Sequence, residues 1–202
     1  TYALAVTSNG HNIGDNVKNA FKVYAKYDRK TGKMPVMGFG LVHTTMKSAF
    51  ETWNYLAQTK GVAGFRDYLL SKHPVRELRA VNKGMKELQD DTVYGGSVIG
   101  SKIGGGFLQN ISGNFDALTM DRWFMRSWGR IVGKLADEQT VRKLVPGTKD
   151  NYVASREVAL IDDPRTGSNR HYIRATVALA LERLRKDYPT LTTADLQAVL
   201  WY

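Results

Sequence analysis

The most constraining feature of this 202-residue chain is a glycine-rich segment at residues 95–106. Three consecutive glycines, Gly104–Gly106, fall within a stretch whose apolar spacing predicts a helix. Each glycine in a helix interior costs about 1 kcal/mol relative to alanine. A helix that retains three of them is expected to have something packed closely against it, either another helix or the backbone of DNA.

The same segment approaches the pattern of a nucleotide-binding P-loop, which ends in glycine, lysine and then serine or threonine. Here Ser101 precedes Lys102, so the last two residues stand in reversed order, and no strand pattern leads into the segment. We therefore do not expect a P-loop. Backbone amides of a glycine turn at a helix start can still hold one DNA phosphate.

Helical periodicity recurs along the rest of the chain, and strand patterns are sparse. We expect helices at residues 1–8, 13–27, 62–70, 103–111, 121–135, 169–188 and 194–202, with others starting near Thr44 or Thr45 and at Pro74. The helix at 13–27 carries its apolar residues on one face: Val17, Ala20, Phe21 and Tyr24. Residues 140–144 are expected to add one helical turn, and residues 146–168 to be irregular. The sequence thus predicts an all-α fold.

Composition narrows the partners and the chemistry. The net charge of +10 and the pI of about 9.7 favour a polyanionic partner such as nucleic acid, although a basic surface can also serve solubility alone. The chain has no cysteine, which excludes disulfides, cysteine nucleophiles and thiolate metal sites. The four histidines lack metal-ligand spacing, so we expect no metal site. No apolar run is long enough to predict a transmembrane helix.

Two ionisable residues lie at the starts of successive predicted helices. Lys102 follows the turn at Gly100, and Asp121 opens the helix after the next loop. An amine nucleophile beside a carboxylate is what attack on a sugar carbon requires, and two helix starts can converge on one cleft. The simpler alternatives are a solvated lysine and a carboxylate stabilised by the helix dipole.

The order of these residues resembles that of the helix-hairpin-helix (HhH-GPD) DNA glycosylase superfamily. The hairpin of that family has the pattern Gly-apolar-Gly-x-Lys. In this chain Val98 occupies the first glycine position, and Gly100 and Lys102 occupy the later ones. The resemblance implies that the hairpin holds DNA phosphates, and the candidate contacts are Gly96, Val98, Gly100 and Ser101. It further implies that Lys102 attacks the sugar carbon.

The resemblance continues into the helix that Asp121 opens. The family pattern there is Val-Asp-x-His-apolar-x-Arg, which Asp121 and Arg126 match, while Trp123 stands in place of the histidine. The resemblance implies that Asp121 activates the lysine or stabilises the cationic sugar, and that Arg126 contacts DNA. An aromatic side chain at the cleft rim can stack on a flipped base, and the candidates are Trp123 and Phe124.

A second match lies near the start of the chain, at residues 3–20. There an apolar helix ends in a polar turn, and a helix carrying Asn, Lys and Ala follows at residues 16–20, which resembles the Asn-Lys-Ala helix in the first conserved block of the family. The resemblance implies that the turn enters the DNA stack and fills the gap left by the flipped base. The residues that would do so are Ser8, Asn9, Gly10 and His11. The two matches together span residues 2–133.

From these residues we expect a helix-hairpin-helix glycosylase-like, all-α protein in which two helical subdomains flank a DNA-binding cleft. Residues 1–145 would form the region with the hairpin and the Lys/Asp site, and residues 146–202 an irregular linker followed by two helices on the same domain. The expected activity is that of a DNA glycosylase with AP-lyase activity, without any metal or organic cofactor. The expected partner is duplex DNA rather than a membrane.

Two alternatives remain open at this stage. One is a non-catalytic DNA-binding protein on the same scaffold, and the other is the same chemistry in a DNA-damaging toxin domain. We expect a monomer in the cytoplasm, associated with the nucleoid, with a secreted effector as the alternative location. The target base is not encoded in any local motif, because pocket residues are scattered along a chain.

Overall fold

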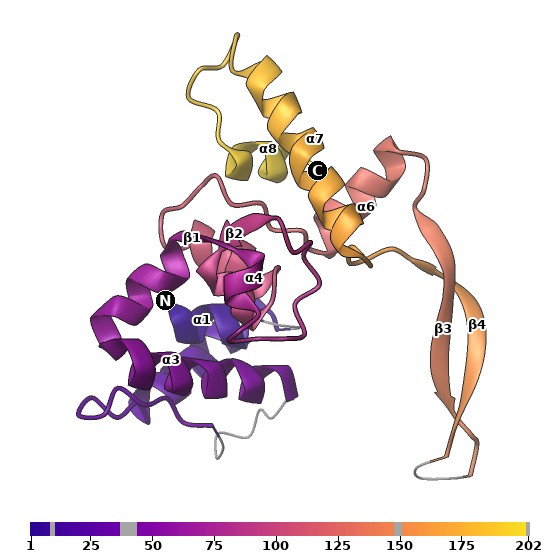
Figure 1. The fold of residues 1–202 in the computed structure, drawn as a ribbon. Helices are drawn as coiled ribbons and strands as arrows, with labels where there is room; N and C mark the ends of the chain where they lie inside the picture. Colours follow the sequence, from indigo (N-terminus) through magenta and orange to yellow (C-terminus); the bar gives the residue numbers. More distant parts are fainter. Residues whose placement is uncertain (9–10, 37–43, 148–150, 201–202) are drawn as a thin grey trace.

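The computed structural model of the chain describes residues 1–8, 11–36, 44–147 and 151–200. Figure 1 shows two helical bodies and a two-stranded ribbon that extends away from both. The first body contains α1 (Tyr2–Thr7), α2 (Ile13–Ala25), α3 (Thr44–Leu70), β1 (Lys72–Pro74), α4 (Val75–Leu78), β2 (Thr92–Tyr94), the 3₁₀ helix η1 (Gly95–Ile99), the π-helical turn η2 (Ile103–Phe107) and α5 (Leu108–Asn110). The second contains α6 (Arg122–Ile131), α7 (Gly167–Leu184) and α8 (Thr193–Val199), and the ribbon is β3 (Ala136–Leu144) and β4 (Tyr152–Leu160).

Each helical body has its own hydrophobic core. In the first body, both halves of α3 supply large buried side chains, including Phe50 and Phe65, and Val98 of η1 joins them. Gly61 has a φ of 71° and kinks α3 between its two halves, which lets both halves face the same core. In the second body, Phe124 of α6 packs with Ile173 of α7.

The glycine-rich segment forms the centre of the first body. η1 and η2 lie so close that a β-carbon on Gly104 would overlap the carbonyl oxygen of Gly96, and one on Gly96 would overlap that of Gly104. Between the two helices the chain turns at Gly100, whose φ of 113° is a conformation that favours glycine. The close neighbour expected from the glycine run is therefore another helix of the same chain.

The prediction of an all-α fold is wrong. The chain is 52% helical and 13% in strands, which form two small antiparallel sheets, so the fold is mixed. β1 pairs with β2 over only three residues, too few to show periodicity. β3 pairs with β4 from Ala136↔Leu160 to Leu144↔Tyr152, where we expected a helical turn at 140–144 and an irregular segment at 146–168.

The sequence analysis did not predict the ribbon because most of its side chains are exposed. Residues of β4 alternate only between exposed and half-buried, since no layer of the protein covers either face. Without one buried face, a strand lacks the regular apolar–polar alternation that identifies it in a sequence. Val158, which is 74% exposed, illustrates how little of this ribbon is packed.

The helix α2 forms where expected but does not bury the expected face. Of the predicted face, Val17, Phe21 and Tyr24 are exposed, and only Ala20 packs partly against the core. The buried side of the helix consists of Asn16, Asn19 and Val23, and the Thr7 hydroxyl donates a 2.6 Å hydrogen bond to the Asn16 side chain. Apolar periodicity located the helix, but it did not identify which side packs.

The second body joins α6, from the predicted 1–145 region, with the C-terminal helices. α6 packs with α7 and α8 around one core. α7 and α8 begin close to their predicted starts, with Thr166 and Thr192 as N-caps. Within the described part of the chain, no helix combines the length and the apolar character needed to cross a bilayer.

Candidate functional site

A cleft of about 790 Å³ lies between the two helical bodies. It is lined from the first body by the polar turn after α1, by the start of α2 and by η2 with the helix that follows. From the second body it is lined by the start of α6 and by α8. The lining residues are Ser8, His11, Asn12, Lys102, Ile103, Phe107, Asn110, Thr119, Asp121, Arg122, Trp123, Ala194, Gln197 and Ala198. Five of these residues were singled out from the sequence: Ser8, His11, Lys102, Asp121 and Trp123.

Lys102 stands where the glycine turn enters η2. Its carbonyl oxygen accepts a 2.9 Å hydrogen bond from the amide of Phe107, so its backbone already belongs to the helical turn. The side chain is half-buried and borders the cleft. Among the described residues, no carboxylate forms an ion pair with the Lys102 ammonium, and Asp121 does not do so either. The amine is thus available to a ligand in the cleft.

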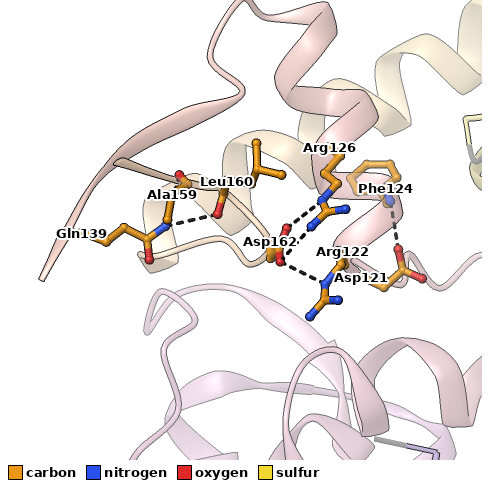
Figure 2. Close-up of polar contacts among 8 residues, drawn as sticks. All are labelled: Asp121, Arg122, Phe124, Arg126, Gln139, Ala159, Leu160 and Asp162. Carbon is orange, nitrogen blue, oxygen red and sulfur yellow. Dashed lines mark hydrogen bonds and ion pairs between the residues drawn. The ribbon is translucent and has the colours of Figure 1, made fainter. Parts of the chain in front are cut away.

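Asp121 is the N-cap of α6. Its backbone is extended, with φ of −87° and ψ of 178°, and its Oδ1 atom accepts a 2.9 Å hydrogen bond from the amide of Phe124 (Figure 2). The helix dipole also favours a negative charge at this position. These two interactions fix the orientation of the carboxylate at the cleft wall. The second oxygen, Oδ2, makes no hydrogen bond to a described residue and is the atom that can face a substrate.

Arg126, expected to contact DNA, is engaged within the protein. Its Nε atom lies 3.0 Å from Oδ1 of Asp162, and Nε of Arg122 lies 2.9 Å from Oδ2 of the same carboxylate. Figure 2 shows Asp162 held between the two arginines. Because Asp162 follows β4 directly, the base of the ribbon is tied to the helix that carries Asp121.

The two aromatic candidates have opposite environments. Trp123 is 59% exposed and borders the cleft, and the guanidinium of Arg126 lies 5.4 Å from the centre of its ring. Phe124 is fully buried in the core of the second body, where its ring stacks on Trp128 with centroids 6.3 Å apart. Only Trp123 is placed where a ligand in the cleft can reach it.

The four predicted hairpin contacts do not form one surface. Gly96 is buried against η2, and the Val98 side chain is only 1% exposed in the core of the first body. Ser101 donates a hydrogen bond to the carboxylate of Glu87 and borders a different cavity. Gly100 is exposed at the tip of the turn. Of these four residues, Gly100 is the one whose backbone is open to solvent.

The predicted wedge is described in part. Asn9 and Gly10 lie outside the described residues. Ser8 ends α1, and its hydroxyl donates a 2.7 Å hydrogen bond to the carbonyl of Ala5. The amide of His11 donates to the carbonyl of Ser8 over 3.3 Å, which closes the turn, and both residues border the cleft.

Sequence reasoning missed the polar residues that complete the cleft. Asn110 lies at the end of α5, and its side-chain oxygen accepts a 3.2 Å hydrogen bond from the hydroxyl of Thr119. The amide of Thr119 in turn donates a 2.8 Å hydrogen bond to Gln197 on α8. No local pattern marks these residues, because their contact joins positions 78 apart. Asn12 was missed as well, although a local signal exists: Asn12 and Asp15 have the spacing of a helix N-cap, and Asn12 caps α2.

We compared the chain with protein-family models, with curated proteins and with solved structures, and found no significant match in any of the three.

Proposed function

We propose that this protein is a DNA glycosylase with AP-lyase activity, and that Lys102 and Asp121 are its catalytic residues. The observation that carries the proposal is their shared position on the wall of one cleft, together with the turn at Ser8 and His11. These residues come from three separate parts of the chain. Their presence around one cleft supports the order of roles that the sequence resemblance implies.

The proposed reaction begins when a base is turned out of the DNA duplex into the cleft. The amine of Lys102 attacks the sugar carbon that bears the base, and the bond from that carbon to the base breaks. The base leaves with the bonding electron pair and takes up a proton, while the amine loses one. The sugar, now joined to the Lys102 nitrogen, then opens: the bond from the same carbon to the ring oxygen breaks, that oxygen takes up a proton, and the nitrogen lone pair forms the double bond of a protonated imine. Loss of a proton from the adjacent C2′ carbon then expels the 3′ phosphate and cleaves the strand.

The absence of an ion pair between Lys102 and Asp121 supports this division of roles. A nucleophile and a carboxylate that act on the same sugar must leave room for it between them. Positive charge develops on the sugar as the base departs, and the Oδ2 atom of Asp121 can stabilise that charge. The hydrogen bond from Phe124 holds the carboxylate in place beforehand, so that little reorganisation is needed.

Two further features support a DNA substrate. The net charge of +10 favours a polyanion. Trp123 provides an exposed ring at the cleft, on which a base can stack.

Borohydride trapping tests the proposal directly. The protein is incubated with duplexes that carry uracil, 8-oxoguanine, oxidised pyrimidines, alkylated bases or hypermodified bases, and borohydride is then added. Reduction of the imine should join protein and DNA covalently in the wild type and in Lys22→Gln, a control at an exposed position on α2. Lys102→Gln should give no adduct.

Two other outcomes have distinct meanings. If Lys102→Gln still releases the base without cutting the strand, the enzyme works through water and the lyase half of the proposal is wrong. If the wild type neither traps nor releases any base of the panel, the protein is a non-catalytic DNA-binding protein.

A further inference from the structure

A second cavity of about 360 Å³ lies on the other side of the hairpin formed by η1 and η2. Lys72 on β1 and Tyr94 on β2 form one wall, Ser97 belongs to η1, and Arg174 and Arg185 come from the second body at and just beyond α7. Ser101 and Gly105 of the hairpin face this cavity, whereas Lys102 and Ile103 face the cleft. The two sites therefore share a wall but no side chains.

Three cationic side chains border this cavity, and two of them lack a strong ion pair. The Lys72 ammonium lies 5.3 Å from the centre of the Tyr94 ring and pairs with no carboxylate among the described residues. Nε of Arg185 donates a 2.8 Å hydrogen bond to the carbonyl of Leu191, which fixes the guanidinium at the cavity. Its ion pair with Asp116, at 3.4 Å, joins two largely exposed side chains, so this pair is weak and can exchange for another anion. Arg174 is held more firmly, at 3.0 Å from the mostly buried carboxylate of Asp91.

A serine hydroxyl also faces the cavity. Ser97 is 4% exposed, and its side chain makes no hydrogen bond to any residue of the described part of the chain. Because Ser97 lines the cavity, its hydroxyl can donate a hydrogen bond to a ligand atom there. Burial and the nearby Asp116 raise the pKa of the Tyr94 hydroxyl, which keeps it protonated at neutral pH and able to donate as well.

The remainder of the lining is apolar. Val93, Val177 and Leu181 are buried core residues that border the cavity. A site with an apolar floor and converging cations and hydroxyls suits a ligand with one anionic end and one apolar or planar end. Its volume lies within the range of small-molecule sites, which hold ligands the size of a nucleotide.

We propose that this cavity binds the phosphate group of an organic phosphate of about nucleotide size. A phosphate offers several acceptor oxygens and close to two negative charges, which matches two cations without a strong ion pair and two hydroxyl donors better than a carboxylate does. The phosphate belongs either to a free nucleotide or to a DNA strand. The inference does not depend on the chemistry proposed for Lys102 and Asp121.

The test is a titration of the ¹⁵N-labelled protein with thymidine 5′-monophosphate. Binding is monitored through the amide chemical shifts in NMR spectra. Saturable shifts are expected at Ser97, Tyr94 and Arg185, with thymidine itself binding at least about tenfold more weakly. Lys72→Gln and Ser97→Ala should each weaken binding by about fivefold to tenfold. Neither substitution removes a hydrogen bond or an ion pair of the folded protein, so both variants should fold. Lys22→Gln is the control and should bind like the wild type.

A short unmodified duplex in a parallel titration identifies the source of the phosphate. If the duplex shifts the same amides and the mononucleotide competes with it, the cavity holds a DNA phosphate. If the duplex leaves those amides unchanged, the ligand is a free organic phosphate. Asp121→Asn should bind the mononucleotide normally, which separates this site from the proposed activity.

Three results would overturn the inference. The first is an absence of shifts up to about 10 mM mononucleotide, because a specific site of this kind should have a dissociation constant below that concentration. The second is equal affinity for thymidine and its monophosphate, because the phosphate would then contribute nothing. The third is unchanged binding by both Lys72→Gln and Ser97→Ala.

Discussion

The carbonyl oxygen of Gly96 occupies the space that a β-carbon on Gly104 would need, so η1 and η2 pack backbone against backbone. Lys102 lies two residues before Gly104, at the start of η2, so this contact fixes the position of the Lys102 backbone. Gly104→Ala should therefore lower the free energy of unfolding by about 1–3 kcal/mol or more, as expected for overpacking in a tight core.

The control for this prediction is Gly64→Ala. Gly64 lies in α3, where the nearest atom to an added β-carbon is 3.8 Å away, so alanine meets no obstacle. That substitution should leave stability unchanged or raise it by up to about 1 kcal/mol. Urea unfolding of both variants measures the difference. Equal stability of Gly104→Ala and the wild type would contradict the backbone packing.

Asp121→Asn should keep the fold and lose base release. Asparagine is as good an N-cap as aspartate, so the hydrogen bond from the Phe124 amide persists and stability should change by less than about 1 kcal/mol. The negative charge is lost, and with it the stabilisation of the cationic sugar, so single-turnover base release should fall about a hundredfold or more. Near-normal release by a folded Asp121→Asn would remove Asp121 from the catalytic assignment.

Trp123 and Phe124 are neighbours in sequence, but we expect truncation to alanine to lower protein stability only at Phe124. Phe124→Ala empties a fully buried site and should lower the unfolding free energy by about 3–5 kcal/mol. Trp123→Ala removes a largely exposed ring, so stability should change by only about 0.5 kcal/mol. Under the proposed function, Trp123→Ala should instead weaken binding of duplexes with an extruded base. Thermal unfolding and DNA-binding titrations on the same preparations separate the two effects.

Binding of duplex DNA should weaken steeply with salt. The chain carries a net charge of +10, and each phosphate that it neutralises should contribute a slope of about −0.9 to the plot of log affinity against log salt. Fluorescence anisotropy with a labelled duplex at several salt concentrations measures this slope. An affinity that is the same at low and at physiological salt would argue against a duplex partner.

The start of α8 should make stability depend on pH in acid. Hydrogen bonds from the side chain and the amide of Thr192 lower the pKa of Asp195 from its usual value of 3.8. A lowered pKa in the folded state contributes stability above pH 3.8, which is lost as the pH falls through the lowered value. The wild type should therefore exceed Asp195→Asn in melting temperature near neutral pH, and the difference should shrink below pH 3.8. A difference that grows on acidification would contradict this linkage.

The features that could be predicted from the sequence are those that depend only on residues close by in the chain. Asp121 could be placed at a helix start because an acceptor side chain there needs only the amides that follow it. For the last helix the sequence predicted Thr193 as the cap, one residue after the observed N-cap Thr192, because two adjacent threonines offer the same acceptor. The glycine run indicated close packing because missing side chains matter only where another backbone approaches. Lys102 and Asp121 could be singled out because each stands at the start of a predicted element.

Tertiary structure decided what depends on distant contacts. Only the packed fold separates Trp123 at the cleft from Phe124 in the core, since both lie on the same helix turn. Only the fold turns the apolar face of α2 outward and pairs β3 with β4 in a ribbon that no layer covers. The partners of Arg126 and of Thr119 lie 36 and 78 residues away, and no local pattern encodes such pairs. The physical reason is the same in each case: burial and long-range hydrogen bonds arise from which surfaces meet, and that is settled only when the whole chain is packed.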